Sequence, residues 1–276
     1  MSEISHTILH DRVSALNAFG RLLDVMYELR EKCPWDHKQT LESLRPNTIE
    51  ETYELCDALI KKNYNEIKKE LGDVLMHILF YSIITEEDNK FDITDVCNSL
   101  CDKLIYRHPH IYPPTEKLPK ESKIETDTQV QEQWEMLKQK EKGGNKRVLS
   151  GVPAALPSLI KAYRIQDKAR NVGFDWEERS QVWKKVKEEI SEFEKEVDEM
   201  HHDKAEQEFG DVLFSIINAA RLYDINPDNA LEYTNRKFIR RFEYLEDKTL
   251  KQGRSLKDMT LAEMDAIWEE AKQFDK

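Results

Sequence analysis

The sequence predicts an all-α protein built from two tandem helical bundles that arose by internal duplication. Apolar residues recur at helical spacing along most of the 276-residue chain, and no stretch of five or more residues alternates with the period of two that marks a strand. When the chain is shifted by 138 positions, a pattern of acidic residues and glycine in its first half falls on the same pattern in its second half. Self-similarity at one fixed spacing is the mark of a repeated structural unit.

The duplication divides the chain into two domains of ordinary size. Gly143-Gly144-Asn145-Lys146 and Gly151-Val152-Pro153 interrupt the helical pattern between them, as a linker does. We therefore expect an N-terminal helical domain over residues 1–142, a linker over 143–155 and a C-terminal helical domain over 156–276.

Periodicity and helix-breaking residues place five helices in the first half. An apolar stripe predicts a helix over residues 9–32, which ends where Pro34 disfavours helical backbone at the residue before it. Residues 48–84 form two predicted helices joined by a short polar stretch. Thr94 is the expected N-cap of a fourth helix, and a fifth is expected over about 126–141.

The second half repeats this plan. Its predicted helices span residues 156–170, 180–200, 204–222, 227–248 and a closing segment from about 260. Gly173-Phe174-Asp175-Trp176 takes the place of Cys33-Pro34-Trp35-Asp36 as the turn before the acidic helices. The same order of elements in both halves supports the duplication.

Four carboxylates on two consecutive helices form the most informative motif of each half. A step of three residues puts two carboxylates on one face of each helix. Two helices that each offer two carboxylates to a shared gap make an oxygen-only site, which Mg²⁺ or Mn²⁺ prefers. The eight expected metal ligands are Glu51, Glu54, Glu70 and Asp73 in the first half and Glu189, Glu192, Glu208 and Asp211 in the second.

The alternative interpretation of these glutamates is a solvated helix face, which is common in a chain that is 35% charged. Between residues 50 and 60, however, only Glu50, Glu51 and Glu54 are identical in the two halves, and the other positions all differ. A duplication that kept its carboxylates while their neighbours changed favours a metal site.

A cationic stripe followed by a tryptophan is the second repeated motif. The stripe and tryptophan are Lys237, Arg240, Arg241 and Trp268 in the second half, and Lys103, Arg107 and Trp134 in the first. The distance from the first lysine to the tryptophan is 31 residues in both halves. A metal, cations and a flat aromatic ring suit a ligand with phosphates at one end and a base at the other. The alternative is that each tryptophan is a core residue.

Composition excludes several partners. A net charge of −12 argues against a nucleic-acid duplex or an anionic membrane as the main partner. The first ten residues lack a secretory signal pattern, and the longest apolar run is too short to span a bilayer. Four cysteines without a Cys-x-x-Cys pair are typical of reduced thiols in a cytoplasmic protein.

Several motifs together resemble the MazG-type nucleoside triphosphate pyrophosphohydrolases, of the all-α NTP pyrophosphatase superfamily. They are Glu-Glu-x-x-Glu followed by Glu-x-x-Asp, Cys-Pro-Trp-Asp at 33–36, Arg-His-Pro-His at 107–110 and Val-Gly-Phe-Asp-Trp at 172–176. The resemblance covers essentially the whole chain. It implies Mg²⁺-dependent hydrolysis of an NTP or dNTP to the monophosphate and pyrophosphate, in a cytoplasmic homodimer that serves nucleotide-pool house-cleaning.

The resemblance also implies roles for individual residues. The eight carboxylates correspond to metal ligands, Lys237, Arg241 and Trp268 to substrate contacts, and Lys185 and Lys204 to further phosphate ligands. The repeated motif itself adds Arg240, Lys103, Arg107 and Trp134 as candidate substrate contacts. Glu188, and Glu50 in the first half, are the candidates to orient or deprotonate a water molecule that attacks the α-phosphorus. The alternative for this glutamate pair is a helix N-terminal position favoured by the helix dipole.

The two halves are expected to be unequal. At the shift of 138 positions, Lys185 falls on Asn47 and Lys204 falls on Glu66. Cations near the carboxylates attract a triphosphate, whereas a further carboxylate repels it. We therefore expect the C-terminal half to carry most of the catalysis and the first half to bind nucleotide weakly or to serve dimerisation or regulation.

Other functions remain open at this stage. One is a substrate-restricted enzyme of the same fold, a dUTP or dCTP diphosphatase or a phosphoribosyl-ATP pyrophosphohydrolase. Another is a non-enzymatic metal-binding or di-iron bundle, although such sites use Glu-x-x-His where Asp73 and Asp211 stand here. A third alternative is a purely structural helical adaptor, but it does not explain why the carboxylates are the same in both halves.

Overall fold

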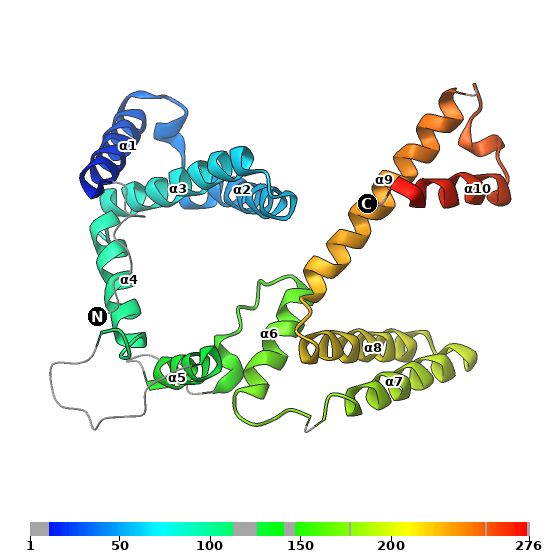
Figure 1. The fold of residues 1–276 in the computed structure, drawn as a ribbon. Helices are drawn as coiled ribbons and strands as arrows, with labels where there is room; N and C mark the ends of the chain where they lie inside the picture. Colours follow the sequence, from blue (N-terminus) through cyan, green and yellow to red (C-terminus); the bar gives the residue numbers. More distant parts are fainter. Residues whose placement is uncertain (1–10, 113–125, 141–146, 177, 252, 275–276) are drawn as a thin grey trace. The chain divides into compact units, whose positions relative to one another are not determined.

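A computed structural model describes residues 11–112, 126–140, 147–176, 178–251 and 253–274. These residues form α-helices and short 3-10 helices and contain no β-strand, which confirms the predicted fold class. The chain separates into a first unit, residues 1–125, and a second unit, residues 126–276 (Figure 1). The helix predicted over 126–141 therefore groups with the second unit, while the predicted boundary at residues 143–155 stays a prediction.

Residues 11–112 of the first unit form four α-helices and one 3-10 helix. In chain order they are α1 (Arg12–Lys32), η2 (Asp36–Lys38), α2 (Leu41–Lys61), α3 (Tyr64–Glu87) and α4 (Ile93–Arg107). Helices α1, α2 and α3 enclose one apolar core, and α3 also contacts α4. The buried residues of this core are Met26, Leu44, Leu79, Phe80, Ile83 and Ile84.

Side-chain caps set the starts of these helices. Thr40 and Ser43 form a capping box, so that α2 begins at Leu41, earlier than the sequence pattern indicated. Helix α4 is capped by Asp92, whose carboxylate accepts the backbone N–H of Asp95 at 2.8 Å. The predicted cap at Thr94 is wrong because Asp92 and Asp95 satisfy each other's backbone N–H groups.

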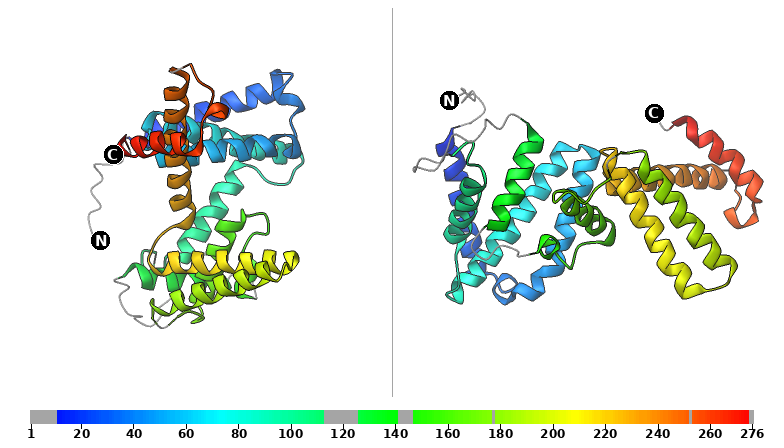
Figure 2. Two further views of the ribbon diagram at one scale, coloured as in Figure 1. Left: turned by 90° about the vertical axis from the view of Figure 1, so that its right-hand side faces the viewer. Right: turned by 90° about the horizontal axis from the view of Figure 1, so that it is seen from below.

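The second unit contains six α-helices and three 3-10 helices among its described residues. They are α5 (Asp127–Lys140), η3 (Val148–Gly151), α6 (Ser158–Arg170), α7 (Gln181–Asp198), α8 (His202–Leu222), α9 (Pro227–Lys251), η4 (Leu256–Asp258), α10 (Leu261–Ala271) and η5 (Lys272–Phe274). Helices α7 and α8 run side by side as a hairpin (Figure 2), and α6 packs on α8.

Two small apolar clusters lie among the described residues of the second unit, one within each helical hairpin. Val182, Val186 and Ala219 are buried between α7 and α8. A second cluster around Leu245 and Ile267 joins α9 to α10. Helix α9 also contacts α6 and α8. The main packed elements of the second unit are therefore the α7–α8 hairpin, with α6 against it, and the α9–α10 hairpin.

Within the described part of the chain, no helix is both long enough and apolar enough to span a bilayer.

Candidate active site

The four carboxylates predicted as metal ligands in the second half lie on α7 and α8, which pack against each other. One carboxylate oxygen each from Glu189, Glu208 and Asp211 lies within 4.8 Å of the others. Glu189 is 7% exposed, so its charge is largely removed from water. Glu192 is exposed beside this group, and desolvation together with the charge of Glu189 raises the pKa of its carboxyl. Of the four predicted ligands, three therefore form a cluster of close carboxylates, and Glu192 lies at its edge.

The first unit repeats this arrangement with a different member at the edge. Oxygens of Glu51, Glu54 and Glu70 lie within 4.8 Å of one another. Asp73 is not part of that group, but burial and the charge of Asp73 raise the pKa of Glu51. The structure therefore brings together three of the four predicted ligands in each half.

The donor set fits a hard divalent cation. Glu70 is 3% exposed; its Oε1 accepts from Lys69 Nζ at 2.9 Å, and its Oε2 has no hydrogen-bond partner among the described residues. Carboxylates gathered in a partly dry site are unfavourable unless cations neutralise them. Since every donor in the two groups is oxygen, Mg²⁺ or Mn²⁺ suits these sites better than a soft transition metal.

Lys185 adds a positive charge to the site of the second unit. Its Nζ lies 2.8 Å from Glu188 Oε1 and 2.7 Å from Glu189 Oε1. Hydrogen bonds to these two glutamates raise the pKa of Lys185 above its usual value, so the side chain is charged at neutral pH. Asn47, its counterpart in the first half, is neutral.

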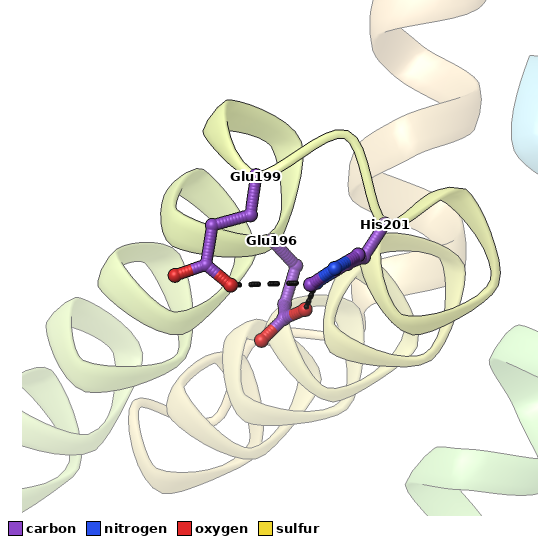
Figure 3. A group of neighbouring side chains, drawn as sticks. All are labelled: Glu196, Glu199 and His201. Carbon is purple, nitrogen blue, oxygen red and sulfur yellow. Dashed lines mark hydrogen bonds and ion pairs between the residues drawn. The ribbon is translucent and has the colours of Figure 1, made fainter.

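Lys204 lies nearer a different group. Its Nζ is 3.8 Å from Glu196 Oε2. Glu196 and Glu199 both pair with His201 at the turn between α7 and α8, with Nδ1 at 2.9 Å and 3.3 Å from their oxygens (Figure 3). The phosphate contact predicted for Lys204 stays a prediction. In the structure Lys204 forms an ion pair with Glu196, near the end of α7.

A cavity of about 660 Å³ extends from the carboxylates of the second unit. Its lining residues combine charged groups with apolar and aromatic side chains, and they come from η3, α6, the turn after α6, α7 and α8. The residues are Leu149, Ile165, Gln166, Ala169, Gly173, Phe174, Asp175, Trp176, Val182, Lys185, Glu189, Asp211, Phe214, Ser215, Asn218 and Arg221. Phe174 is 82% exposed, so an aromatic face is available to a ligand.

A buried ion pair fixes the turn that forms one wall of this cavity. Arg221 is 5% exposed and donates to Asp175 at 2.6 Å and 3.0 Å, and also to Asn218 Oδ1 at 2.8 Å. Burial raises the pKa of Asp175, but hydrogen bonds from Arg221 and from the backbone N–H of Trp176 outweigh this effect, so that the pKa is lowered.

The sequence indicated the turn at residues 173–176 only as a repeated pattern. It did not identify Gln166, Asn218 or Arg221 as cavity residues. The available signal was Arg221, a cation near the end of an apolar helical run. A buried cation requires a carboxylate partner, but the sequence alone does not say which acidic residue supplies it.

The cationic stripe and Trp268 lie on the α9–α10 hairpin. The Arg241 guanidinium lies 5.4 Å from the centre of the Trp268 ring, and the rings of Phe238 and Trp268 are 4.9 Å apart. The structure thus brings Arg241 and Trp268 together, with Lys237 one helical turn earlier and Arg240 beside it. In the first half, Lys103 and Arg107 lie on α4, whereas Trp134 lies on α5 in the second unit.

The cavity beside the carboxylates of the first unit is different. It measures about 510 Å³ and is lined by five carboxylates, two lysines and three other residues. They are Glu50, Glu54, Asp57, Glu66, Glu70, Lys61, Lys69, Tyr53, Ala58 and Asn63. At the shift of 138 positions, Phe80 and Ile83 stand for Asn218 and Arg221, and both are buried in the first core. The first unit therefore fills with core side chains the positions that line a cavity in the second.

Comparison with known proteins identifies the family. The model of the MazG nucleotide pyrophosphohydrolase domain matches residues 39–112 and 178–245, which include both carboxylate groups. The chain is 40% identical to the Thermotoga maritima nucleoside triphosphate pyrophosphohydrolase/pyrophosphatase MazG, across 94% of this chain and 97% of that protein. It is 36% identical to the Escherichia coli K12 nucleoside triphosphate pyrophosphohydrolase, across 94% and 98%.

A Bacillus subtilis protein, YabN, is 42% identical across 94% of this chain and 52% of its own length. The family match falls once in each half, on α2 to α4 and on α7 to α9, as expected for a duplicated domain. The chain belongs to the MazG nucleotide pyrophosphohydrolase family.

Proposed function

We propose that this chain hydrolyses nucleoside triphosphates to the monophosphate and pyrophosphate at the carboxylate site of the second unit. The observation that carries the proposal is the cavity that joins Glu189 and Asp211 to an aromatic and apolar chamber. A ligand with a polyanion at one end and a flat base at the other matches that lining. The names of the two full-length relatives support a general nucleoside triphosphate over the substrate-restricted alternatives.

The reaction is a displacement at the α-phosphorus by water. A new P–O bond forms on the α-phosphorus, the bond to the oxygen that bridges to the β-phosphate breaks, and pyrophosphate leaves with the electron pair. Glu189, Glu192, Glu208 and Asp211 would hold Mg²⁺, which when bound would neutralise the phosphate charge and lower the pKa of the attacking water. Glu188 accepts the proton of the water, and Glu50 has the same position in the first unit.

Basic side chains hold the phosphates. Lys185 already lies within 2.8 Å of two carboxylates, so its charge is fixed at the site before substrate enters. We assign further phosphate contacts to Lys204, Lys237, Arg240 and Arg241. The ring contacts of Trp268 are with Arg241 and Phe238, so its proposed role is to fix the Arg241 guanidinium for phosphate binding.

The second unit carries most of the activity in this proposal. Its cavity combines Lys185 with an apolar chamber, whereas the cavity of the first unit has five carboxylates and no comparable aromatic turn among its lining residues. A triphosphate brings about four negative charges, which additional carboxylates repel. The substrate contacts predicted for Lys103, Arg107 and Trp134 therefore contribute less to turnover than those of the second unit in this proposal.

We further propose a homodimer. Helix α9 exposes Phe238, Ile239 and Phe242, with 56%, 54% and 37% of each accessible. Apolar side chains gathered on one helix of a soluble unit favour association. A cytoplasmic location and a role in nucleotide-pool house-cleaning stay predictions.

The test of the proposed function is product analysis with a panel of triphosphates. With Mg²⁺ present, each ribo- and deoxyribonucleoside triphosphate that is a substrate is expected to give its monophosphate and pyrophosphate in equal amounts. Chelation of the metal is expected to abolish turnover, and added Mg²⁺ to restore it. Formation of the diphosphate and inorganic phosphate, or undiminished turnover in excess chelator, would contradict the proposal. Turnover confined to dUTP, dCTP or phosphoribosyl-ATP would identify a substrate-restricted enzyme instead.

A further inference from the structure

Lys185 bridges two glutamates that have different proposed roles. It lies on α7, and its Nζ is 2.8 Å from Oε1 of Glu188 and 2.7 Å from Oε1 of Glu189. Glu188 is the proposed acceptor of a proton from the attacking water, and Glu189 is a proposed metal ligand. One ammonium group is thus shared between the proposed base and the buried member of the carboxylate cluster.

An ammonium against the buried carboxylate recurs in the two units. Glu189 is 7% exposed and pairs with Lys185, while Glu70 is 3% exposed and pairs with Lys69 at 2.9 Å. Asn47 stands at the position of Lys185 in the first half, so the two units supply the lysine from different helices. A buried carboxylate is unfavourable without a cation beside it. The change of position with retention of the pair indicates that the lysine balances the charge of the cluster.

One ammonium does not neutralise the whole cluster of the second unit. Desolvation and the charge of Glu189 raise the pKa of Glu192, and the charge of Lys185 only partly offsets this rise. The cluster therefore still favours a divalent cation, but that cation would share Glu189 with the ammonium of Lys185. Two positive groups on one carboxylate repel each other. Metal binding is then favoured when Lys185 leaves Glu189 for another anion.

A triphosphate supplies such an anion within reach of Lys185. Lys185 and Glu189 both line the cavity of the second unit, and 38% of the lysine side chain is exposed. Lysine carries its charge on a flexible stem with three rotatable donors, so rotation of side-chain bonds suffices to move the ammonium onto a phosphate oxygen. One charge-assisted hydrogen bond then replaces another. Both glutamates become available for the roles proposed above.

We propose that Lys185 is an exchangeable counterion, which pairs with Glu188 and Glu189 until a triphosphate enters and then pairs with the phosphates. Metal binding and nucleotide binding are coupled by this exchange, because each is favoured when the ammonium leaves Glu189, and such coupling is reciprocal. The inference rests on the proposed function and deepens it. The site binds a divalent cation together with a nucleotide, and binds the free cation weakly.

Mn²⁺ binding without nucleotide tests the exchange, with free Mn²⁺ measured by electron paramagnetic resonance. All proteins carry Glu51→Gln and Glu54→Gln, so that the cluster of the first unit does not contribute. We expect Lys185→Met to bind Mn²⁺ about tenfold more tightly than this background, since a unit charge close to the cation is removed. Lys185→Arg keeps the charge, and Lys187→Met removes one from an exposed position on α7. Both should stay within about threefold of the background, the scale of a solvent-screened charge.

The same substitution is expected to have the opposite effect on nucleotide affinity. The probe is α,β-methylene-ATP, whose carbon bridge prevents the proposed cleavage, and its binding at saturating Mn²⁺ is followed by calorimetry. Lys185→Met should weaken this binding about tenfold, the scale of one lost charge-assisted contact. A merely structural role for the lysine would change both affinities in the same direction. Lys185→Gln is the second neutral variant, should Lys185→Met not fold by circular dichroism.

Two results would overturn the inference. One is unchanged or weaker Mn²⁺ binding in a folded neutral variant of Lys185. The other is retention of the Mn²⁺ affinity in Glu189→Gln, since binding would then not involve the carboxylate that the lysine contacts. Turnover of ATP by the wild-type protein reports on the proposed function separately. Tighter Mn²⁺ binding in Lys185→Met, combined with a wild-type protein that does not hydrolyse ATP, would support the competition at Glu189 and contradict the proposed function.

Discussion

Replacement of Glu189 by glutamine is expected to lower turnover by about 10²-fold or more, while Glu51→Gln leaves turnover within a few-fold of the wild type. Glutamine keeps the size of the side chain but removes the charge, and one electrostatic contributor at a reacting phosphate is worth about this much. Glu189 is buried, contacts Lys185 and lines the large cavity, whereas Glu51 belongs to the acidic site of the first unit. The measurement is kcat at saturating Mg²⁺ and substrate.

The control for this pair is Glu194→Gln, at an exposed position on α7. Glutamine is as good a helix former as glutamate, so circular dichroism should be unchanged in all three variants. Near-normal turnover in Glu189→Gln, together with loss of turnover in Glu51→Gln, would reverse the assignment of the active half.

Replacement of Arg221 by methionine is expected to lower the free energy of unfolding by about 3–5 kcal/mol. The change leaves Asp175 partly buried without its cation, and removal of one partner from a buried ion pair has this effect. Because the folded-state pKa of Asp175 is lowered, the pair contributes stability above the unfolded-state pKa of that carboxyl. This contribution is lost as the pH falls through the folded-state pKa. Urea unfolding followed by circular dichroism at neutral and at acidic pH measures both effects.

The matched control is Arg179→Met, which removes an exposed pair whose atoms lie 3.6 Å apart. A surface pair contributes about 0–1 kcal/mol, so this variant should unfold almost like the wild type. Asp175→Asn combined with Arg221→Met should recover part of the loss, since no unpaired charge remains. If Arg221→Met is as stable as Arg179→Met at neutral pH, Asp175 and Arg221 do not form a stabilising pair.

The two halves show how a duplicated domain can diverge around a common carboxylate cluster. Both keep a cluster of three close carboxylates, with the fourth at its edge. In the first unit Phe80 and Ile83 complete an apolar core, while Asn218 and Arg221 line a cavity at the equivalent positions of the second. At these equivalent positions one copy thus has core side chains and the other has side chains that line a cavity.

The helices and the carboxylate groups could be predicted from the sequence because both depend on local spacing. A helix of 3.6 residues per turn dictates which residues share a face, and the repeat indicated on which faces the carboxylates would come together. The cap at Asp92 was missed because Thr94 and Asp92 are both good capping residues, and the capping box with Asp95 decides between them.

The cavity could not be predicted in the same way. Its walls come from α6, from the turn at residues 173–176, from α7 and from α8, and no spacing rule relates α6 and the turn to the α7–α8 hairpin. The same holds for Gln166, whose hydrogen bond to the backbone oxygen of Phe214 joins α6 to α8, two helices that no spacing rule relates.

Hydrolysis in ¹⁸O-labelled water tests the central claim most directly, because the label marks the phosphorus atom that water attacks. With Mg²⁺ and ATP we expect one ¹⁸O atom in each AMP formed and none in pyrophosphate, detected by mass spectrometry of the products. The same distribution should persist, at a much lower rate, in Glu189→Gln. Label in pyrophosphate or in inorganic phosphate would show attack at another phosphorus and would contradict the account.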